Sequence, residues 1–222
     1  MRYIIMCGGT YVKWQTPRQM LVIDGEPIIA RTIRLLRENG IEDIAISSNS
    51  EIFEQFGVPV LHHENDYTTV EYNNSTGYWC NAFYPTDEPT CYLFGDVVFS
   101  PEAIKKIVET ETDDIAFFGS APPFSEHYCK PYIEPFCFKV VNTDHLKQAI
   151  QDVKEIEKQG RFNRIPIAWE LWNVISRGPG PDPNTIDYDS YVHINDYTCD
   201  IDNPKEAGLV ERIAREIYLT SP

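Results

Sequence analysis

Long apolar runs, basic residues and paired cysteines are all scarce in this chain of 222 residues. No apolar stretch approaches the ~20 residues that cross a bilayer, so we expect no membrane-spanning helix. Lysine and arginine together number 19 against 34 aspartates and glutamates, which gives a formal net charge of −15. Because a surface this acidic repels nucleic acid and anionic lipid, we expect neither as a partner.

The cysteine pattern and the missing targeting signal indicate a reducing compartment. None of the six cysteines forms a C-x-x-C pair, which argues against a zinc site. No cleavable leader precedes the first apolar segment, so we expect free thiols and a cytoplasmic location. The length fits one domain and no internal repeat is present, so residues 1–222 are predicted to form a single domain.

Apolar segments of strand length alternate with amphipathic segments in the first half of the chain. Strands are predicted at residues 3–6, 43–47, 58–61, 91–94 and 114–118, and helices at 27–39, 75–83 and directly after Ser100. In the second half, strands are predicted at 132–141 and 191–194, helices at 143–158, 166–175 and 203–218, and loops at 119–131 and 177–189. This order predicts an α/β fold whose central sheet is mixed but mostly parallel.

The first chemical motif is the Cys-Gly-Gly-Thr segment at residues 7–10, directly after the first predicted strand. Paired glycines at the carboxyl end of a buried strand let the backbone approach a phosphate closely, and ligands of open α/β sheets bind at that edge. A tight turn without a ligand is the alternative interpretation. Lys13 and Arg18 favour the phosphate site, because they place two cations after this turn in an otherwise acidic chain.

Two acidic segments are further candidates for chemistry: one follows a predicted strand, and the other is itself an extended segment near residue 200. Asp96 comes after the strand predicted at 91–94, and an acid at such a strand end needs a partner. A divalent cation is one candidate partner, and the turn that Asp96 would cap is the other. Asp200 and Asp202 alternate along an extended segment and therefore project to the same side. A helix cap by Asp202 or Asn203 is the structural alternative for this segment.

Together these segments resemble the nucleotidyltransferases that attach a nucleotide to a sugar 1-phosphate or to a phospho-alcohol such as phosphocholine. The glycines of residues 7–10 match that family's signature loop, while Tyr11 replaces its third glycine. Lys13 stands where the family has arginine, and Arg18 stands where it has lysine, so positive charge is retained at both positions. Arginine and lysine differ in donor geometry, so the exchange also alters how a phosphate would be held.

The resemblance implies a three-layer, Rossmann-like nucleotidyltransferase fold and a Mg²⁺-dependent reaction. Its two acidic segments are matched here, so Asp96 and Asp202 are the implied metal ligands, with Asp200 as their neighbour. The substrates would be an NTP, with CTP or UTP favoured, and a small phosphorylated acceptor, and pyrophosphate would be released. Residues 119–190 would form an insert region on the acceptor side, and the oligomeric state is left open.

Roles for further residues follow from the same resemblance. Lys13 and Arg18 would be catalytic, Tyr72 would contact the acceptor, and Lys130, in the loop at 119–131, is the candidate for meeting the acceptor phosphate. A cap-rich turn is the alternative for residues 73–75. Nucleotide-binding roles are implied for Cys7, Gly8, Gly9, Thr10, Asn73, Asn74, Ser75 and Gly95.

Two other functions stay open at this point. A glycosyltransferase that uses a nucleotide sugar would also have strand-end acids and a metal, although cations at Lys13 and Arg18 suit a triphosphate better. The second alternative is a non-catalytic relative that only binds a nucleotide. It stays open because Tyr11 replaces the third glycine of the signature loop. Aromatic residues such as Trp79 and Trp169 would either line a pocket for a cationic group or belong to the core.

Overall fold

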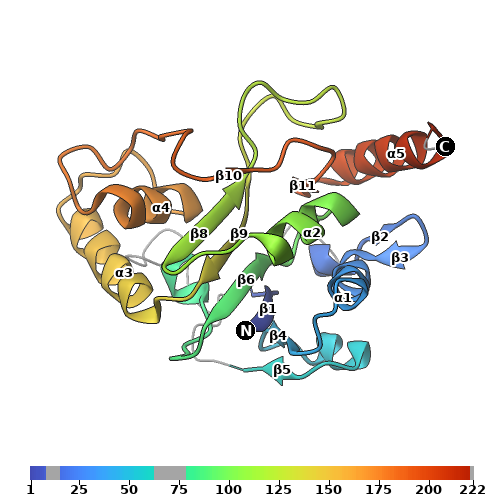
Figure 1. Ribbon diagram of the computed structural model, residues 1–222, viewed down its shortest axis with the longest axis horizontal. Coiled ribbons are helices and arrows are strands. Elements are labelled where there is room, and N and C mark those ends of the chain that lie inside the picture. Colours follow the sequence, from blue (N-terminus) through green and yellow to red (C-terminus); the bar gives the residue numbers. More distant parts are fainter. Residues whose placement is uncertain (9–15, 63–78, 221–222) are drawn as a thin grey trace.

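The computed structural model describes residues 1–8, 16–62 and 79–220. A seven-stranded sheet crosses the molecule in the order β10-β8-β9-β6-β1-β4-β5 (Figure 1). Its neighbouring strands are parallel except where β9 pairs with β6 and β8, which confirms the expected mixed, mostly parallel sheet. The strands are β1 (Arg2–Met6), β4 (Ile44–Ser47), β5 (Val60–Leu61), β6 (Thr90–Phe94), β8 (Ile115–Gly119), β9 (Pro135–Val140) and β10 (Val192–His193).

Helices cover both faces of this sheet and make a three-layer arrangement (Figure 1). Helices α1 (Ile28–Glu38) and α2 (Pro101–Glu109) pack on one face, and α3 (Thr143–Lys158) and α4 (Ala168–Arg177) pack on the other. Helix α5 (Pro204–Thr220) packs instead against the hairpin of β2 (Val22–Ile23) and β3 (Glu26–Pro27). No helix within the described ranges has the length and apolar character that a bilayer span requires.

Strand β1 shows why the apolar runs are continuous rather than alternating. Tyr3 and Ile5 pack into the layer of α1 and α2, whereas Ile4 and Met6 pack into the layer of α3 and α4. All four side chains are buried. A central parallel strand that is covered on both faces needs apolar residues at every position, and this is what the sequence supplies.

Most element boundaries agree with the sequence within a few residues, and the differences have local causes. Helix α2 begins at the expected cap, because Ser100 Oγ accepts a hydrogen bond from the backbone N–H of Ala103 at 2.9 Å. Helix α3 is capped by Asn142, whose Oδ1 accepts from the N–H of His145 at 3.1 Å, and not by Thr143 or Asp144. The side-chain amide oxygen of Asn142 reaches the first turn of the helix, so the N-cap lies one residue before Thr143, the first of the two expected positions.

Two predicted elements are shorter than expected. The strand predicted at 132–141 begins only at Pro135. The helix predicted at 75–83 lies partly outside the described residues, and its described end, Trp79–Ala82, is a 3₁₀ helix. The short pieces that sequence periodicity did not indicate are η1 (Arg18–Met20), η2 (Glu51–Phe56), β2, β3, β7 (Val97–Val98) and β11 (Cys199–Asp200).

Two antiparallel pairings bring distant acids to one edge of the sheet. Strand β9 runs opposite to β6, so the residue just before it, Glu134, lies near the carboxyl ends of the parallel strands. Strand β11 pairs with β7, with Asp200 opposite Val97. The N–H of Ile201 also donates to the carbonyl oxygen of Asp96 at 3.0 Å, which fixes the two acidic segments side by side.

Candidate active site

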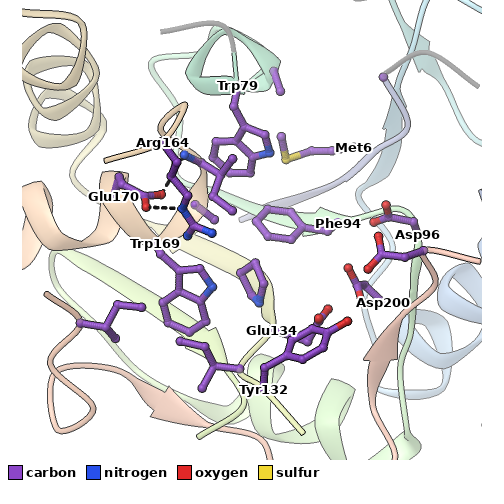
Figure 2. A pocket seen from close by; sticks show the side chains of 18 of the residues that line it. Met6, Trp79, Phe94, Asp96, Tyr132, Glu134, Arg164, Trp169, Glu170 and Asp200 are labelled. Carbon is purple, nitrogen blue, oxygen red and sulfur yellow. Dashed lines mark hydrogen bonds and ion pairs between the residues drawn. The ribbon is translucent and has the colours of Figure 1, made fainter. Parts of the chain in front are cut away.

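A pocket of about 1010 Å³ opens at the carboxyl ends of β1 and β6. Acidic side chains lie at one end, Arg164 and Glu170 lie at the other, and aromatic rings lie between them (Figure 2). Gly8 and Arg18, which the sequence assigned to a phosphate site after the first strand, both line it. This is the edge at which ligands of open α/β sheets bind.

The floor of the pocket depends on a close approach between β1 and β6. The N–H of Gly95 donates to the carbonyl oxygen of Met6 at 3.0 Å. A Cβ atom on Gly95 would lie 2.5 Å from that same oxygen and 2.7 Å from Cys7 Sγ, so only glycine fits. Burial, with a smaller contribution from the negative charge of Asp96, raises the pKa of the Cys7 thiol well above its ordinary value. Cys7 therefore packs as a neutral core residue beneath the pocket.

Arg18 joins the two carboxylates that the sequence nominated for the metal. Its Nη2 lies 2.8 Å from Asp96 Oδ2, and its Nη1 lies 3.1 Å from Asp202 Oδ1. Nη1 also donates to the carbonyl oxygen of Ile201 at 3.0 Å. Burial raises the pKa of Asp96, Arg18 opposes that rise, and Asp200 and Asp202 add to it. The fold therefore brings Asp96 and Asp202 together, although they lie far apart in the sequence.

Lys130 sits inside the acidic end rather than on the pocket wall. Its side chain is 2% exposed, and its Nζ donates to Glu134 Oε1 at 3.1 Å and to Asp202 Oδ2 at 3.0 Å. The same ammonium forms an ion pair with Asp200 and lies 3.6 Å from Glu206 Oε2. Burial alone would lower the pKa of Lys130, but the surrounding carboxylates outweigh it and raise the pKa. Lys130 therefore stays protonated in this cluster.

Glu134 is a site residue that the sequence did not indicate. It is buried, and burial together with the adjacent Asp200 carboxylate raises the pKa of Glu134 to about 10. Its Oε2 has no hydrogen-bond partner among the described residues. An acid within the apolar segment predicted as a strand was a usable signal, of the same kind as Asp96. Its spacing from the other acids gave no such signal, because the antiparallel course of β9 is not visible in the sequence.

The donor set at this end fits a hard divalent cation. Carboxylate oxygens of Glu134, Asp200 and Asp202 all lie within 4.8 Å of one another. The unpartnered Oε2 of Glu134 adds a buried oxygen with unused acceptor capacity. Oxygen-only ligand sets of this type suit Mg²⁺, which takes one or two carboxylates and completes its octahedron with water and phosphate oxygens. Nitrogen and sulfur ligands for zinc do not take part in this cluster.

The opposite end of the pocket is organised by the start of α4. Glu170 is buried, accepts from the N–H of Ile167 at 2.9 Å and accepts from Arg164 Nε at 2.7 Å. The carboxylate thus caps the helix and holds the arginine at the same time. Figure 2 shows the guanidinium of Arg164 extending into the pocket between Trp79 and Trp169. Sequence reasoning did not identify Arg164, since one cation in a surface loop carries no pattern.

Aromatic rings form the wall between the two ends. Trp79 and Phe94 pack edge to face with centroids 5.4 Å apart, and both line the pocket with Tyr132 and Trp169 (Figure 2). Trp172, by contrast, stacks on a ring within the core and donates from Nε1 to Ser190 Oγ at 2.8 Å. The aromatic residues nominated by the sequence thus divide between the pocket and the core.

Several nominated residues lie outside the described part of the chain. The residues whose placement the structure does not describe are Gly9, Thr10, Lys13, Tyr72, Asn73, Asn74 and Ser75. Those that it does describe are Cys7, Gly8, Arg18, Gly95, Asp96, Lys130 and Asp202, and they all lie at or beneath the acidic end of the pocket. Their convergence from four segments of the chain makes this edge the candidate active site.

Residues 3–162 match the family model of the MobA-like NTP transferase domain. The chain belongs to the MobA-like NTP transferase family. It is accordingly a nucleotidyltransferase, as its signature segments implied. The match ends before Asp200 and Asp202, so the last acidic segment is placed at the site by the structure and not by the family model. A search of curated proteins returns no match.

Solved structures with the same fold extend over nearly the whole chain of this MobA-like transferase. A protein from Bacillus anthracis described as a candidate glucose-1-phosphate thymidylyltransferase, in complex with sucrose, is 16% identical with a TM-score of 0.56, covering 97% of this chain and 96% of its own. The inositol-1-phosphate CTP transferase from T. maritima is 15% identical with a TM-score of 0.53, covering 96% and 95%. These likenesses confirm the predicted nucleotidyltransferase fold.

Proposed function

We propose that this nucleotidyltransferase joins an NTP, with CTP or UTP favoured, to a small phosphorylated acceptor such as a sugar 1-phosphate or phosphocholine. An oxygen of the acceptor phosphate attacks the α-phosphorus of the NTP, the bond from that phosphorus to the bridging oxygen breaks, and pyrophosphate leaves. The observation that carries the proposal is the junction of Arg18 with Asp96 and Asp202 in the pocket that Gly8 also lines.

Asp96 and Asp202 are the proposed ligands of Mg²⁺, with Asp200 and Glu134 beside them. When bound, the ion would neutralise the charge that builds on the α-phosphate. Arg18 already reaches both carboxylates and is the proposed catalytic cation from the described residues. Lys13 is the proposed second catalytic cation. Positioning and charge neutralisation of this kind require no general base.

The nucleotide is proposed to bind over the glycine turn. Residues 7–10 and Gly95 would supply backbone N–H groups and close approach, and residues 73–75 would contact the base. The requirement for glycine at Gly95 supports this side of the proposal, since a side chain there would collide with the carbonyl oxygen of Met6, the residue just before this segment.

The acceptor is proposed to occupy the aromatic end of the pocket, which residues 119–190 help to build. Arg164, held by Glu170, supplies a cation for an anionic group of the acceptor, and Trp79 and Trp169 supply flat apolar surfaces beside it. Tyr72 and Lys130 stay proposed acceptor contacts. Two structural neighbours are described as enzymes for phosphorylated acceptors, glucose 1-phosphate and inositol 1-phosphate, which is the class proposed here.

A screen for pyrophosphate release tests the whole proposal. CTP, UTP, ATP, GTP and dTTP are each combined with glucose 1-phosphate, inositol 1-phosphate and phosphocholine, in MgCl₂ and in EDTA. We expect turnover with at least one pair in MgCl₂, none in EDTA, and none with Asp96→Asn or Asp202→Asn. Hydrolysis or transfer from UDP-sugars without pyrophosphate release would support a glycosyltransferase instead. NTP-dependent thermal shifts without turnover of any acceptor would support a non-catalytic relative.

A cytoplasmic location is part of the proposal. All six cysteines are free thiols, and five of them are buried. A reducing compartment keeps thiols in this state and also contains the NTP substrates.

A further inference from the structure

Lys130 occupies the position that a cation would take among the carboxylates. Its Nζ lies within 3.6 Å of oxygens from four acids, and three of these, Glu134, Asp200 and Asp202, contribute to the group of oxygens within 4.8 Å of one another. The side chain is almost fully buried, so water does little to screen these contacts. Lys130 is therefore the dominant neutralising charge at the centre of the acidic end.

The ring of Tyr132 is a further partner of the Lys130 ammonium. Nζ lies over this ring, 5.5 Å from its centroid, while it contacts the carboxylates, and Tyr132 is half exposed and lines the pocket. A lysine side chain has four rotatable bonds, so its ammonium is able to leave the carboxylates without a change in the backbone. The aromatic face would then keep the displaced ammonium on the pocket side.

We propose that Lys130 is the resident counter-ion of the metal-free site, and that it gives up its contacts with Asp200 and Asp202 when a divalent cation binds there. The inference rests on the proposed metal site. An ammonium and a divalent cation cannot both stay about 3 Å from the same oxygens, because their like charges repel strongly in a buried site. Lys130 thereby competes with the metal, sets its affinity, and turns toward the pocket only after the metal has arrived.

This assignment separates Lys130 from a purely structural lysine. Loss of a structural lysine leaves buried acids unpaired, destabilises the fold with and without metal, and leaves metal affinity unchanged. Loss of a competing counter-ion destabilises the metal-free protein but removes a rival for the same oxygens, so metal affinity increases. The sign of the change in affinity is therefore the diagnostic measurement.

The experiment uses Mn²⁺ alone as the probe, titrated into the full chain by calorimetry, with Tm recorded in EDTA and in saturating MnCl₂. We expect Lys130→Met to bind Mn²⁺ at least about tenfold more tightly than the wild type, since close buried charge pairs interact strongly enough for that factor. Its Tm should fall in EDTA and be largely restored by Mn²⁺. Unchanged or weaker Mn²⁺ binding by this variant overturns the proposal.

Lys139 provides the matched control. It is also a buried lysine, but its Nζ donates to the carbonyl oxygens of Ile107, Val108 and Thr110 at the end of α2. Lys139→Met should lower the Tm equally in EDTA and MnCl₂ and leave the Mn²⁺ affinity within twofold of the wild type. A tightening as large as that of Lys130→Met would overturn the proposal, because it would follow from the loss of any buried lysine.

A measurement on the wild type decides the matter even where Lys130→Met does not fold. Acetylation with a limiting amine reagent, read by mass spectrometry, should find Lys130 protected without metal and at least about fivefold more reactive in saturating MnCl₂, while Lys139 stays protected in both. The factor is an order-of-magnitude expectation for an ammonium released from several carboxylates. Protection of Lys130 in MnCl₂ overturns the proposal. If the wild type binds no Mn²⁺, the metal site itself fails, and the titration of the wild type alone shows it.

Discussion

Arg18 uses both terminal nitrogens, and each one contacts a different acid. A lysine at this position would carry the same charge but offers a single point of contact. We expect Arg18→Ala to lower kcat/KM by about 10²–10³-fold, the usual effect of removing one preorganised donor from charge developing in a transition state. Arg18→Lys should recover part of the loss. Pyrophosphate release measures both, and circular dichroism checks that the variants fold. A kcat/KM of Arg18→Ala within threefold of the wild type contradicts the catalytic role.

Gly95 is expected to tolerate no side chain. Gly95→Ala places a Cβ 2.5 Å from the carbonyl oxygen of Met6, so β1 and β6 must move apart, at a cost of about 1–3 kcal/mol in the free energy of unfolding. Urea denaturation measures the loss. The control is Gly208→Ala in α5, where an added Cβ meets nothing within 4 Å. That variant should gain about 0.5–1 kcal/mol from helix propensity. A stable Gly95→Ala protein would contradict the close approach.

Cys129 is expected to be the one thiol that reacts in the native protein. The other five cysteines are buried, whereas Cys129 is partly exposed. A hydrogen bond with Cys199 lowers the pKa of the Cys129 thiol, burial opposes this, and the charge of Lys130 adds to the lowering. Burial raises the pKa of Cys80 to about 12, so that thiol stays protonated and inert. Ellman's reagent at pH 8 should titrate one thiol quickly, and Cys129→Ser should abolish that phase.

Among the elements, α2 is expected to depend strongly on its N-cap, Ser100, the residue just before the helix. Ser100 Oγ accepts from the N–H of Ala103 and also contacts the carboxylate of Asp196. Since Ser100 is fully buried, Ser100→Ala removes the cap and leaves Asp196 without this partner. We expect a loss of about 1–2 kcal/mol in the free energy of unfolding, measured by urea denaturation. Asn142→Ala at the exposed cap of α3 is the comparison and should cost less, about 0.5–1 kcal/mol. Equal losses would contradict the importance of burial.

The elements also show how far the sequence predicts this molecule. Strands such as β1 and helices such as α1 and α2 carry continuous apolar runs, periodicity and caps, so local pattern was sufficient to place them. Asp96 was found for the same reason, as an acid at the end of an apolar strand. The pairing of β11 with β7 is only two residues long, and no local pattern encodes it.

The parts of the site that the sequence did not predict depend on contacts between distant segments. Glu134 reaches the acidic end because β9 runs antiparallel, and strand direction is set by connections over many residues. Lys130 was expected near the acceptor, but its burial among carboxylates follows from the docking of residues 200–206, which is a tertiary event. Arg164 is positioned by its ion pair with Glu170 and not by any motif. The sequence thus indicates which residues have suitable side chains, but it does not indicate which charged side chains from distant segments come into contact.

At the scale of the whole molecule, the two layers of helices share one sheet. The four buried residues of β1, Tyr3 to Met6, each pack into one layer or the other, so neither layer is able to unfold while the other stays intact. We therefore predict a single cooperative unfolding transition in urea. Trp79, Trp169 and Trp172 all pack in the layer of α3 and α4, so their fluorescence reports on that layer, while far-ultraviolet circular dichroism follows both layers. The two curves should coincide, and midpoints that differ by more than about 0.3 M urea would contradict one domain.

The docking of residues 200–206 sets the charge balance of the site. Without that segment, the site's described charges are two cations and two acids, from Arg18, Lys130, Asp96 and Glu134. The segment adds three acids at once, from Asp200, Asp202 and Glu206. The described part of the site is therefore formally neutral until this segment docks and formally carries three negative charges afterwards. The attraction that the proposed metal would feel thus arises from this one tertiary contact.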